Sequence, residues 1–302
     1  MTSFAILLVT ISAFAHAFWN FLSKRQNPAA AFFLMASVAA VVLLSPLLLV
    51  FRKGIIMIPP SVWVLLIATG IVQAVYYVAL AGAYRHGDLS LAYPLARAIP
   101  VILVALVSLA LGRGRQIGLL AFGGFALVTA GCLILPQQKF GDLRLEHYRH
   151  RWVWFALLAA ACITAYTLLD DQALRTLRSL PGMPVSNLGW ALLWVEMETA
   201  SLSVALAIIV LAYVPERRVL VQATGSVWRS AALLGIIITL TYGIVLLAMA
   251  YVSNVSYISA FRQLSIPVGA ALGIFFRKEP AYKPKLVGVG IIMAGLVLVA
   301  LG

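Results

Sequence analysis

The sequence predicts an all-α integral membrane protein in which ten transmembrane helices form two inverted five-helix repeats. Three observations lead to this fold class. The 302 residues are 63% hydrophobic and 10% charged, whereas soluble domains carry roughly 25% charge. Ten apolar runs have about the 18 residues or more that a helix needs to cross a bilayer core of roughly 30 Å. One stretch of the first half also recurs in the second half.

The apolar runs do not alternate with polar residues as strands of a membrane barrel would, so helices are expected. The two cysteines lie inside these runs and predict neither a disulfide framework nor a zinc site. The ten expected helices lie near Ser3–Leu22, Ala31–Phe51, Val62–Ala83, Ser90–Leu111, Ile117–Leu135, Trp152–Leu169, Asn187–Tyr213, Arg229–Tyr251, Val255–Phe276 and Lys285–Leu301.

The internal repeat is clearest where AYRHGDLSLAYPLARAIPV, which begins at Ala83, is echoed by AYVSNVSYISAFRQLSIPV, which begins at Ala250. Each copy joins the third and fourth helices of a half, so we expect halves at 1–135 and 152–302 joined by a basic linker at 136–151. Because five is odd, the halves must insert in opposite orientations. Two glycine pairs seven residues apart, Gly124 and Gly131 in one half and Gly288 and Gly295 in the other, predict close helix packing.

The net charge of +13 is interpreted through the loops rather than as a nucleic-acid surface. Loops after the odd-numbered helices carry 14 arginines and lysines, whereas those after the even-numbered helices carry 6. Positively charged loops remain in the cytoplasm. We therefore expect both termini on the outer side of the membrane.

Several stretches resemble the EamA-type transporters of the drug/metabolite transporter superfamily. They are HAFWN from His16, YRHGDLSLAYPLARAIPV from Tyr84, and SYISAFRQLSIPVGAALGIFFRKEP from Ser256, which ends near the acidic Glu279. The likeness covers nearly the whole chain and departs at Gly112 and Arg113, where the family often has an acidic residue. The resemblance implies secondary transport of a small metabolite and, by analogy, export.

Two arginines lie inside predicted helices, Arg97 in the fourth and Arg262 in the ninth. Each is about 10 Å into its helix at 1.5 Å per residue. Inversion places Arg97 on the cytoplasmic side of the midplane and Arg262 on the outer side. The repeat alignment offsets them by two residues, so the sequence leaves open whether both face one cavity. Carboxylate binding and a structural ion pair or snorkelling are weighed equally.

The seventh helix contains two carboxylates, Glu196 and Glu198, on different faces. Trp190, Trp194 and Glu198 share one stripe, which suits an ammonium group through charge and cation–π attraction. Glu198, and secondarily Glu196, are also candidates for carrying a coupling proton. The alternative is that the two glutamates only neutralise Arg97 and Arg262.

Further polar residues are expected along the substrate pathway. His16, Trp19 and Asn20 form a stripe on the first helix. His16 ranks below Glu198 as a proton carrier, because a lone intramembrane histidine is more often a packed hydrogen-bonding residue. The remaining candidates for substrate binding are Tyr77, Tyr93, Tyr166, Tyr242 and Gln263.

These observations favour a proton-coupled exporter of a small zwitterion, such as an amino-acid-like metabolite or an opine-type metallophore, working by alternating access. The alternatives are an importer of a quaternary amine or phosphonate-type nutrient, a lipid-carrier flippase, and a membrane scaffold. No nucleophile, metal cluster or phosphate-binding loop suggests an enzyme or a cofactor. The expected partners are the small-molecule substrate and membrane lipids, with no nucleic acid, and the chain is a monomer or homodimer.

Overall fold

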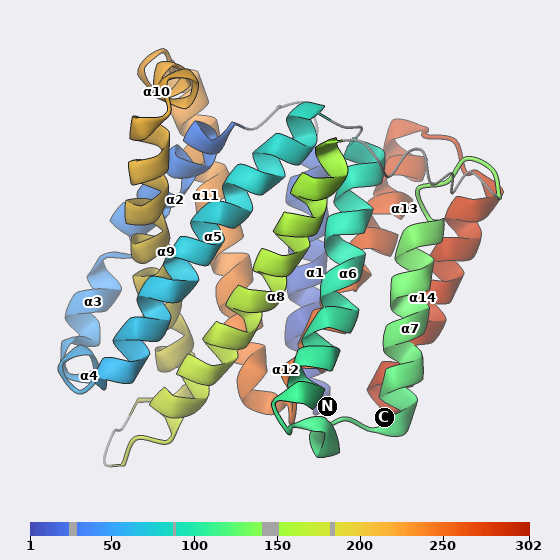
Figure 1. The fold of residues 1–302 in the computed structure, drawn as a ribbon, viewed down its shortest axis with the longest axis horizontal. Coiled ribbons are helices and arrows are strands. Elements are labelled where there is room, and N and C mark those ends of the chain that lie inside the picture. Colours follow the sequence, from blue (N-terminus) through green and yellow to red (C-terminus); the bar gives the residue numbers. More distant parts are fainter. Residues whose placement is uncertain (24–28, 87–88, 141–150, 182–184) are drawn as a thin grey trace.

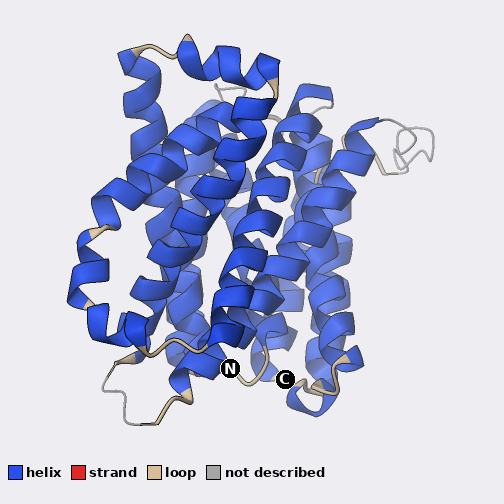
Figure 2. Cartoon of the chain, turned by 60° about the vertical axis from the view of Figure 1, so that its left-hand side comes forward, coloured by secondary structure: helices blue, strands red, loops and turns tan. Residues whose placement is uncertain are grey.

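The computed structural model describes residues 1–23, 29–86, 89–140, 151–181 and 185–302. In this part of the chain all regular structure is helical (Figure 2). Among the described residues ten apolar segments follow one another, of which seven are long enough to cross a membrane and three are shorter. They are α1 (Ser3–Ser23), α2 (Ala30–Leu44) with α3 (Pro46–Val50), α5 (Pro60–His86), α6 (Leu89–Ala110), α7 (Leu119–Ile134), α8 (Arg151–Arg178), α9 (Asn187–Ala212), α11 (Gly225–Ala248) with η3 (Met249–Tyr251), α12 (Val255–Phe261) with η4 (Arg262–Leu264) and α13 (Ser265–Arg277), and α14 (Lys283–Leu301).

The connections contain the short helices α4 (Arg52–Ile56), η1 (Gly114–Gln116) and α10 (Val214–Val221). Both chain ends lie at the bottom of the bundle in Figure 1, and α10 lies at the opposite end. We call these the termini end and the α10 end. The outer face of α1 presents an apolar stripe of exposed residues at helical spacing, as expected of a surface against lipid: Phe4, Leu7, Ile11, Phe14 and Phe18.

The contacts between the two halves occur in reciprocal pairs. The third helix of each half packs on the first helix of the other, as α5 on α8 and α11 on α1. The third helix also packs on the second, as α5 on α9 and α11 on α2. The fourth packs on the first, as α6 on α8 and α13 on α1. This exchange is the pattern expected from two inverted five-helix repeats.

The fifth helices α7 and α14 stand side by side (Figure 1), where the glycine pairs predicted close packing. A Cβ atom on Gly124 would lie 2.7 Å from the carbonyl oxygen of Gly295. One on Gly131 would lie 2.8 Å from that of Gly288. These distances are too short for any side chain, so the close approach that the glycines predicted is confirmed and lies within one chain.

Two helices differ from the sequence-based expectation. The sixth expected helix, α8, runs to Arg178, nine residues beyond the expected end at Leu169. Asp170 and Asp171 are therefore inside a helix and fully buried rather than in a loop. The ninth segment is interrupted, because one 3₁₀ turn at Arg262–Leu264 separates α12 from α13. Pro267 lacks the N–H that would bind the carbonyl of Gln263, which explains why the helix breaks here.

Candidate functional site

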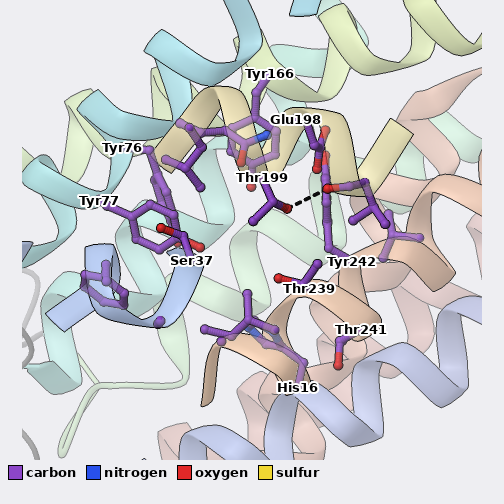
Figure 3. Close-up of a pocket in the computed structure, with 18 of the residues that line it drawn as sticks. His16, Ser37, Tyr76, Tyr77, Tyr166, Glu198, Thr199, Thr239, Thr241 and Tyr242 are labelled. Atoms are coloured by element: carbon purple, nitrogen blue, oxygen red, sulfur yellow. Dashed lines mark hydrogen bonds between the residues drawn. The ribbon is translucent and has the colours of Figure 1, made fainter. Parts of the chain in front are cut away.

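A cavity lined by apolar, polar and charged residues lies between helices of both halves (Figure 3). Residues of α1, α2, α5 and α6 line it from the first half, and residues of α8, α9, α11 and η4 from the second. The lining comprises Ser12, Ala13, His16, Phe33, Ala36, Ser37, Gln73, Tyr76, Tyr77, Leu80, Arg97, Tyr166, Val195, Glu198, Thr199, Leu202, Gly235, Ile238, Thr239, Thr241, Tyr242, Val245 and Arg262.

Aromatic rings form a continuous chain along this cavity. Phe33 and Tyr77 have ring centroids 4.5 Å apart, and Tyr77 lies 5.0 Å from Tyr76. Tyr76 meets Tyr166 edge to face at 5.9 Å, and Tyr166 meets Tyr242 in the same way at 5.8 Å. The rings come from α2, α5, α8 and α11, so this wall is assembled from both repeats. Tyrosine faces attract cations, and the hydroxyl groups supply hydrogen bonds.

Both intramembrane arginines line the cavity and meet each other. Nη2 of Arg97 donates to the backbone oxygen of Arg262 at 3.1 Å and to Oγ of Ser265 at 3.2 Å. The guanidinium of Arg262 lies 5.3 Å from the ring centroid of Tyr242 and within hydrogen-bonding reach of Tyr166. The sequence left open whether both arginines face one cavity, and the structure brings them together in it. Their placement on opposite sides of the midplane stays a prediction.

Asp170 is the centre of a buried hydrogen-bond network behind the cavity wall. Its Oδ1 accepts from Oγ1 of Thr69 at 2.8 Å and from Nε1 of Trp194 at 3.2 Å. Its Oδ2 accepts from the hydroxyl of Tyr242 at 2.6 Å. The side chain is fully buried, and such a group is tolerated only where donors replace water. Asp170 thus ties α5, α9 and α11 to α8.

Glu198 stands between this network and the cavity. Its side chain is buried, lines the cavity and points into it in Figure 3. The carboxyl group is within hydrogen-bonding reach of Asp170, Gln73 and Trp194. Its Oε2 has no hydrogen-bond partner among the described residues. Glu198 is therefore the carboxyl group that a ligand in the cavity would meet first.

Other sequence-predicted residues lie away from the cavity. Trp194 does not line it, because its indole is buried and donates to Asp170. Trp190 is buried likewise, so tyrosines rather than tryptophans form the aromatic wall. Gln263 donates to the backbone of its own helix at Ser259, 3.0 Å away. Glu196 is buried outside the cavity lining, and neither of its oxygens has a hydrogen-bond partner among the described residues.

The proposed neutralisation of the arginines by glutamates is not seen for Arg262. In the described part of the chain no ion pair within 4.0 Å joins Arg262 to Glu196 or Glu198. Its guanidinium is held by tyrosines instead. His16 lines the cavity from α1. The side chains of Trp19, Asn20 and Tyr93 lie outside the described residues.

Asp170 and its partner Thr69 were not predicted from the sequence. Helical spacing, rather than hydropathy, could have identified Asp170. Asp170 follows Tyr166 by four residues and therefore continues the polar face of the same helix. The expected helix ended at Leu169 only because a run of apolar residues ends there.

Buried ion pairs connect the helices at the termini end. The carboxylate of Asp171 is fully buried and lies between Nη1 of Arg113 at 3.0 Å and Nε of Arg175 at 2.8 Å. Arg113 also contacts the side chain of Gln172, and Arg175 donates to the backbone of Ser253 at 3.0 Å. Arg113, in the loop between α6 and η1, thus links the first half to α8 of the second.

A different ion pair lies at the α10 end. Oε1 of Glu216 is 2.7 Å from Nη2 of Arg85, and Oε2 accepts from the backbone N–H of Ala31 at 2.9 Å. Glu216 therefore joins the end of α5 to the start of α2, where the first turn of the helix leaves N–H groups unpaired. The Arg85 side chain is half exposed, so this contact is more accessible than the one at Asp171.

Comparisons with known proteins agree with the membrane fold. Residues 3–136 match the model of the EamA-like transporter family. A solved structure described only as the crystal structure of a protein aligns with a TM-score of 0.68 at 15% identity, covering 100% of this chain and 99% of that one. No curated protein matches the chain. At this identity the structural likeness shows the fold alone.

Proposed function

We propose that the chain is an EamA-type membrane transporter whose cargo is a small zwitterion, because residues 3–136 match the model of that family. The cargo class is amino acids and amino-acid-derived metabolites, including carboxylate-rich opine-type metallophores. The observation that carries this proposal is that one cavity holds two arginines, a chain of tyrosines and a buried glutamate.

The arginine end of the cavity suits a carboxylate. Arg97 and Arg262 approach each other through a side chain to backbone contact, so both positive charges lie in the same region. Of the described carboxyl groups, Glu198 lines the same cavity, and it makes no ion pair with Arg262. Guanidinium groups bind carboxylates through two parallel hydrogen bonds. A carboxylate of the cargo would therefore complete the charge balance at this end.

The tyrosine and glutamate end suits an ammonium group. Tyr76, Tyr77, Tyr166 and Tyr242 offer ring faces and hydroxyl groups, and Glu198 offers a carboxyl group. A cation gains more from ring faces when water is excluded. The two ends together favour cargo that carries both charges over a simple cation or anion.

Alternating access is supported by the reciprocal packing of the two halves, in which each half can take the role of the other. In this mechanism the contacts of Asp171 with Arg113 and of Glu216 with Arg85 would open in turn at opposite ends. We further propose export in exchange for protons, with Glu198 as the coupling residue.

We propose the orientation of the chain in the membrane from the distribution of its positive charge. The α10 end would face the cytoplasm, and both termini would lie on the outer side of a cell inner membrane. The domain boundaries at 135 and 152 belong to the same proposal. The chain is proposed to work as a monomer or homodimer.

The tyrosine chain also favours a second candidate, an importer of a quaternary amine or a phosphonate. Aromatic rings are the usual recognition element for quaternary ammonium groups. This candidate differs in its use of Arg97 and Arg262, because a purely cationic nutrient needs neither arginine. A lipid-carrier flippase is disfavoured, since two arginines and a glutamate line the cavity.

The first test compares host cells with and without this gene by untargeted mass spectrometry of medium and cell extract. A zwitterion that accumulates inside the cells lacking the gene and vanishes from their medium supports export. A medium compound that is no longer consumed supports import instead.

The second test measures thermal unfolding of the purified protein with mixed amino acids, choline, glycine betaine or 2-aminoethylphosphonate. A ligand at 100 times its Kd stabilises the folded protein by about 2.7 kcal/mol. Stabilisation by amino acids that disappears in Arg97→Gln and Arg262→Gln supports a zwitterionic cargo. Stabilisation by choline that survives both substitutions would overturn it in favour of a cation.

A further inference from the structure

Two carboxyl groups are in contact in the middle of the bundle. Asp170 of α8 and Glu198 of α9 are both buried and lie within hydrogen-bonding reach of each other. Ionised carboxylates only accept hydrogen bonds. Two of them in contact therefore repel each other, and neither has a proton to donate. A contact of this kind is stable when one proton lies between the two groups.

The hydrogen-bond donors around the pair are unequally distributed. Asp170 accepts from Thr69, Trp194 and Tyr242, so both of its oxygens already have partners. Glu198 keeps one oxygen without a partner among the described residues. Three donors stabilise a charged carboxylate at Asp170. The proton of the pair therefore belongs on Glu198, which then donates to Asp170.

The position of the pair gives this proton a route. Glu198 lines the cavity, whereas Asp170 lies behind it and outside the lining. A proton that leaves Glu198 enters the cavity directly, while Asp170 stays fixed by its three donors. Proton exchange with the pair thus occurs at the surface where the cargo would bind.

Charged and titratable groups face the pair from every neighbouring element. They are His16 on α1, Tyr76 and Tyr77 on α5, Arg97 on α6, Tyr166 on α8, Tyr242 on α11 and Arg262 on η4. Glu196, the other buried glutamate of α9, does not line the cavity. When Glu198 is protonated, the two arginines face one negative charge, that of Asp170. When Glu198 loses its proton, they face two negative charges.

Tyr242 connects the pair to the arginine end. Its hydroxyl donates to Asp170, and its ring lies under the guanidinium of Arg262. A change of charge at the pair therefore acts on the residue that holds Arg262. Proton loss and carboxylate binding are linked through this one side chain.

We propose that Asp170 and Glu198 form a single proton-binding site, in which Asp170 is a fixed acceptor and Glu198 exchanges the proton with the cavity. When the site empties, the O–H bond of Glu198 breaks, the proton passes to water, and an ammonium group takes its place beside the carboxylate. This step rests on the proposed zwitterion exporter for its role in coupling, but the existence of the site does not.

The test is infrared difference spectroscopy of the purified protein in lipid bilayers while the pH is raised, with no cargo present. The wild type should show the C=O band of a protonated carboxyl group that vanishes in one step. Glu198→Gln should lose this band. Asp170→Asn should keep the band but change the pH at which it vanishes. Glu196→Gln is the matched control on the same helix and should keep the wild-type titration of this band.

Several outcomes would overturn the site. One is a band that survives Glu198→Gln when Glu196 is also replaced by glutamine, and another is an Asp170→Asn titration that coincides with the wild type. A band removed by sodium at constant pH would make the pair a sodium site. If Asp170→Asn does not fold, Tyr242→Phe removes one donor to Asp170 and should also move the titration.

A separate measurement tests the cargo, independently of the infrared result. Amino acids that do not stabilise the protein overturn the zwitterion while leaving the infrared result unchanged. Proteoliposomes containing a pH-sensitive dye then test coupling, using the amino-acid mixture as the probe. Coupling is supported if amino acid flux is accompanied by proton movement in the wild type and by no proton movement in Glu198→Gln. Amino acid flux without proton movement in the wild type contradicts coupling.

Discussion

Nη2 of Arg97 donates a hydrogen bond to the backbone oxygen of Arg262 at 3.1 Å, so a side chain of the first half caps a helix break in the second. Breaks within the membrane leave carbonyl groups that need partners. Oγ of Ser265 donates to the same oxygen at 2.9 Å. The contact fixes the two arginines beside each other and makes the position of Arg262 depend on Arg97.

We expect Arg97→Lys to impair this arrangement although it keeps the charge. A lysine ammonium is a point charge and cannot reproduce the planar fork of a guanidinium, which contacts both Arg262 and Ser265. Binding of a stabilising amino acid should weaken at least about tenfold, equal to about 1.4 kcal/mol. Thermal unfolding at several ligand concentrations measures this. Arg217→Lys on the exposed face of α10 is the control, and equal affinities for the two variants would contradict the prediction.

We expect Trp194→Phe to weaken the network at Asp170. The indole N–H lies 3.2 Å from Oδ1 of Asp170, and phenylalanine removes this donor. A hydrogen bond to a charged group contributes about 1.5–3 kcal/mol. Trp190→Phe is the matched control, because Trp190 is buried in the same helix and no hydrogen bond of its indole is seen among the described residues. Chemical unfolding should show a larger loss of stability for Trp194→Phe, and an equal loss would mean that only ring volume matters.

The membrane fold was predictable because its signals are local. Apolar length defined the spans, and the repeated stretch at Ala83 and Ala250 indicated two inverted halves. The glycine pairs of α7 and α14 predicted a close contact that the structure confirms. These features need no knowledge of neighbouring helices, since lipid requires each span to satisfy its own backbone.

The arrangement of the site was less predictable because it depends on tertiary contacts. Hydropathy ended the sixth span before Asp170, although donors from three other helices make that position tolerable. The angular offset between Arg97 and Arg262 was calculated for ideal α-helices, but Arg262 lies in the 3₁₀ turn η4, where that geometry does not apply. The stripe that placed Trp194 beside Glu198 was real, but Trp194 donates to Asp170 behind the wall.

We expect Asp171→Asn to destabilise the termini end strongly. Its carboxylate lies between Arg113 and Arg175 and is fully buried, so the substitution leaves two guanidinium groups facing each other. The guanidinium groups are 24% and 33% exposed, so the cost should lie below the value of about 3–5 kcal/mol for a fully buried ion pair. Thermal unfolding of the purified protein measures the loss.

Glu279→Gln is the control for this prediction. Its carboxylate pairs with Lys285 at 3.3 Å but remains partly exposed, and such pairs contribute about 0–1 kcal/mol. A decrease for Asp171→Asn no larger than that for Glu279→Gln would show that the cluster does not hold α6 against α8.

We expect Gly124→Ala to disturb the packing of α7 on α14, whereas Gly123→Ala does not. The new Cβ at Gly124 would lie 2.7 Å from the carbonyl oxygen of Gly295 and 2.9 Å from the backbone nitrogen of Val299. Backbone atoms cannot rotate away, so the helices must separate, at a cost of about 1–3 kcal/mol. A Cβ at Gly123 meets nothing within 4 Å.

Because glycine is less favourable than alanine in a helix by about 1 kcal/mol, Gly123→Ala should leave the protein unchanged or slightly more stable. The two substitutions are adjacent and chemically identical, so the difference between their unfolding temperatures isolates the helix contact. Equal unfolding temperatures for the two variants would mean that α7 and α14 can separate at no cost. The contact between these fifth helices would then not stabilise the packing of the two halves.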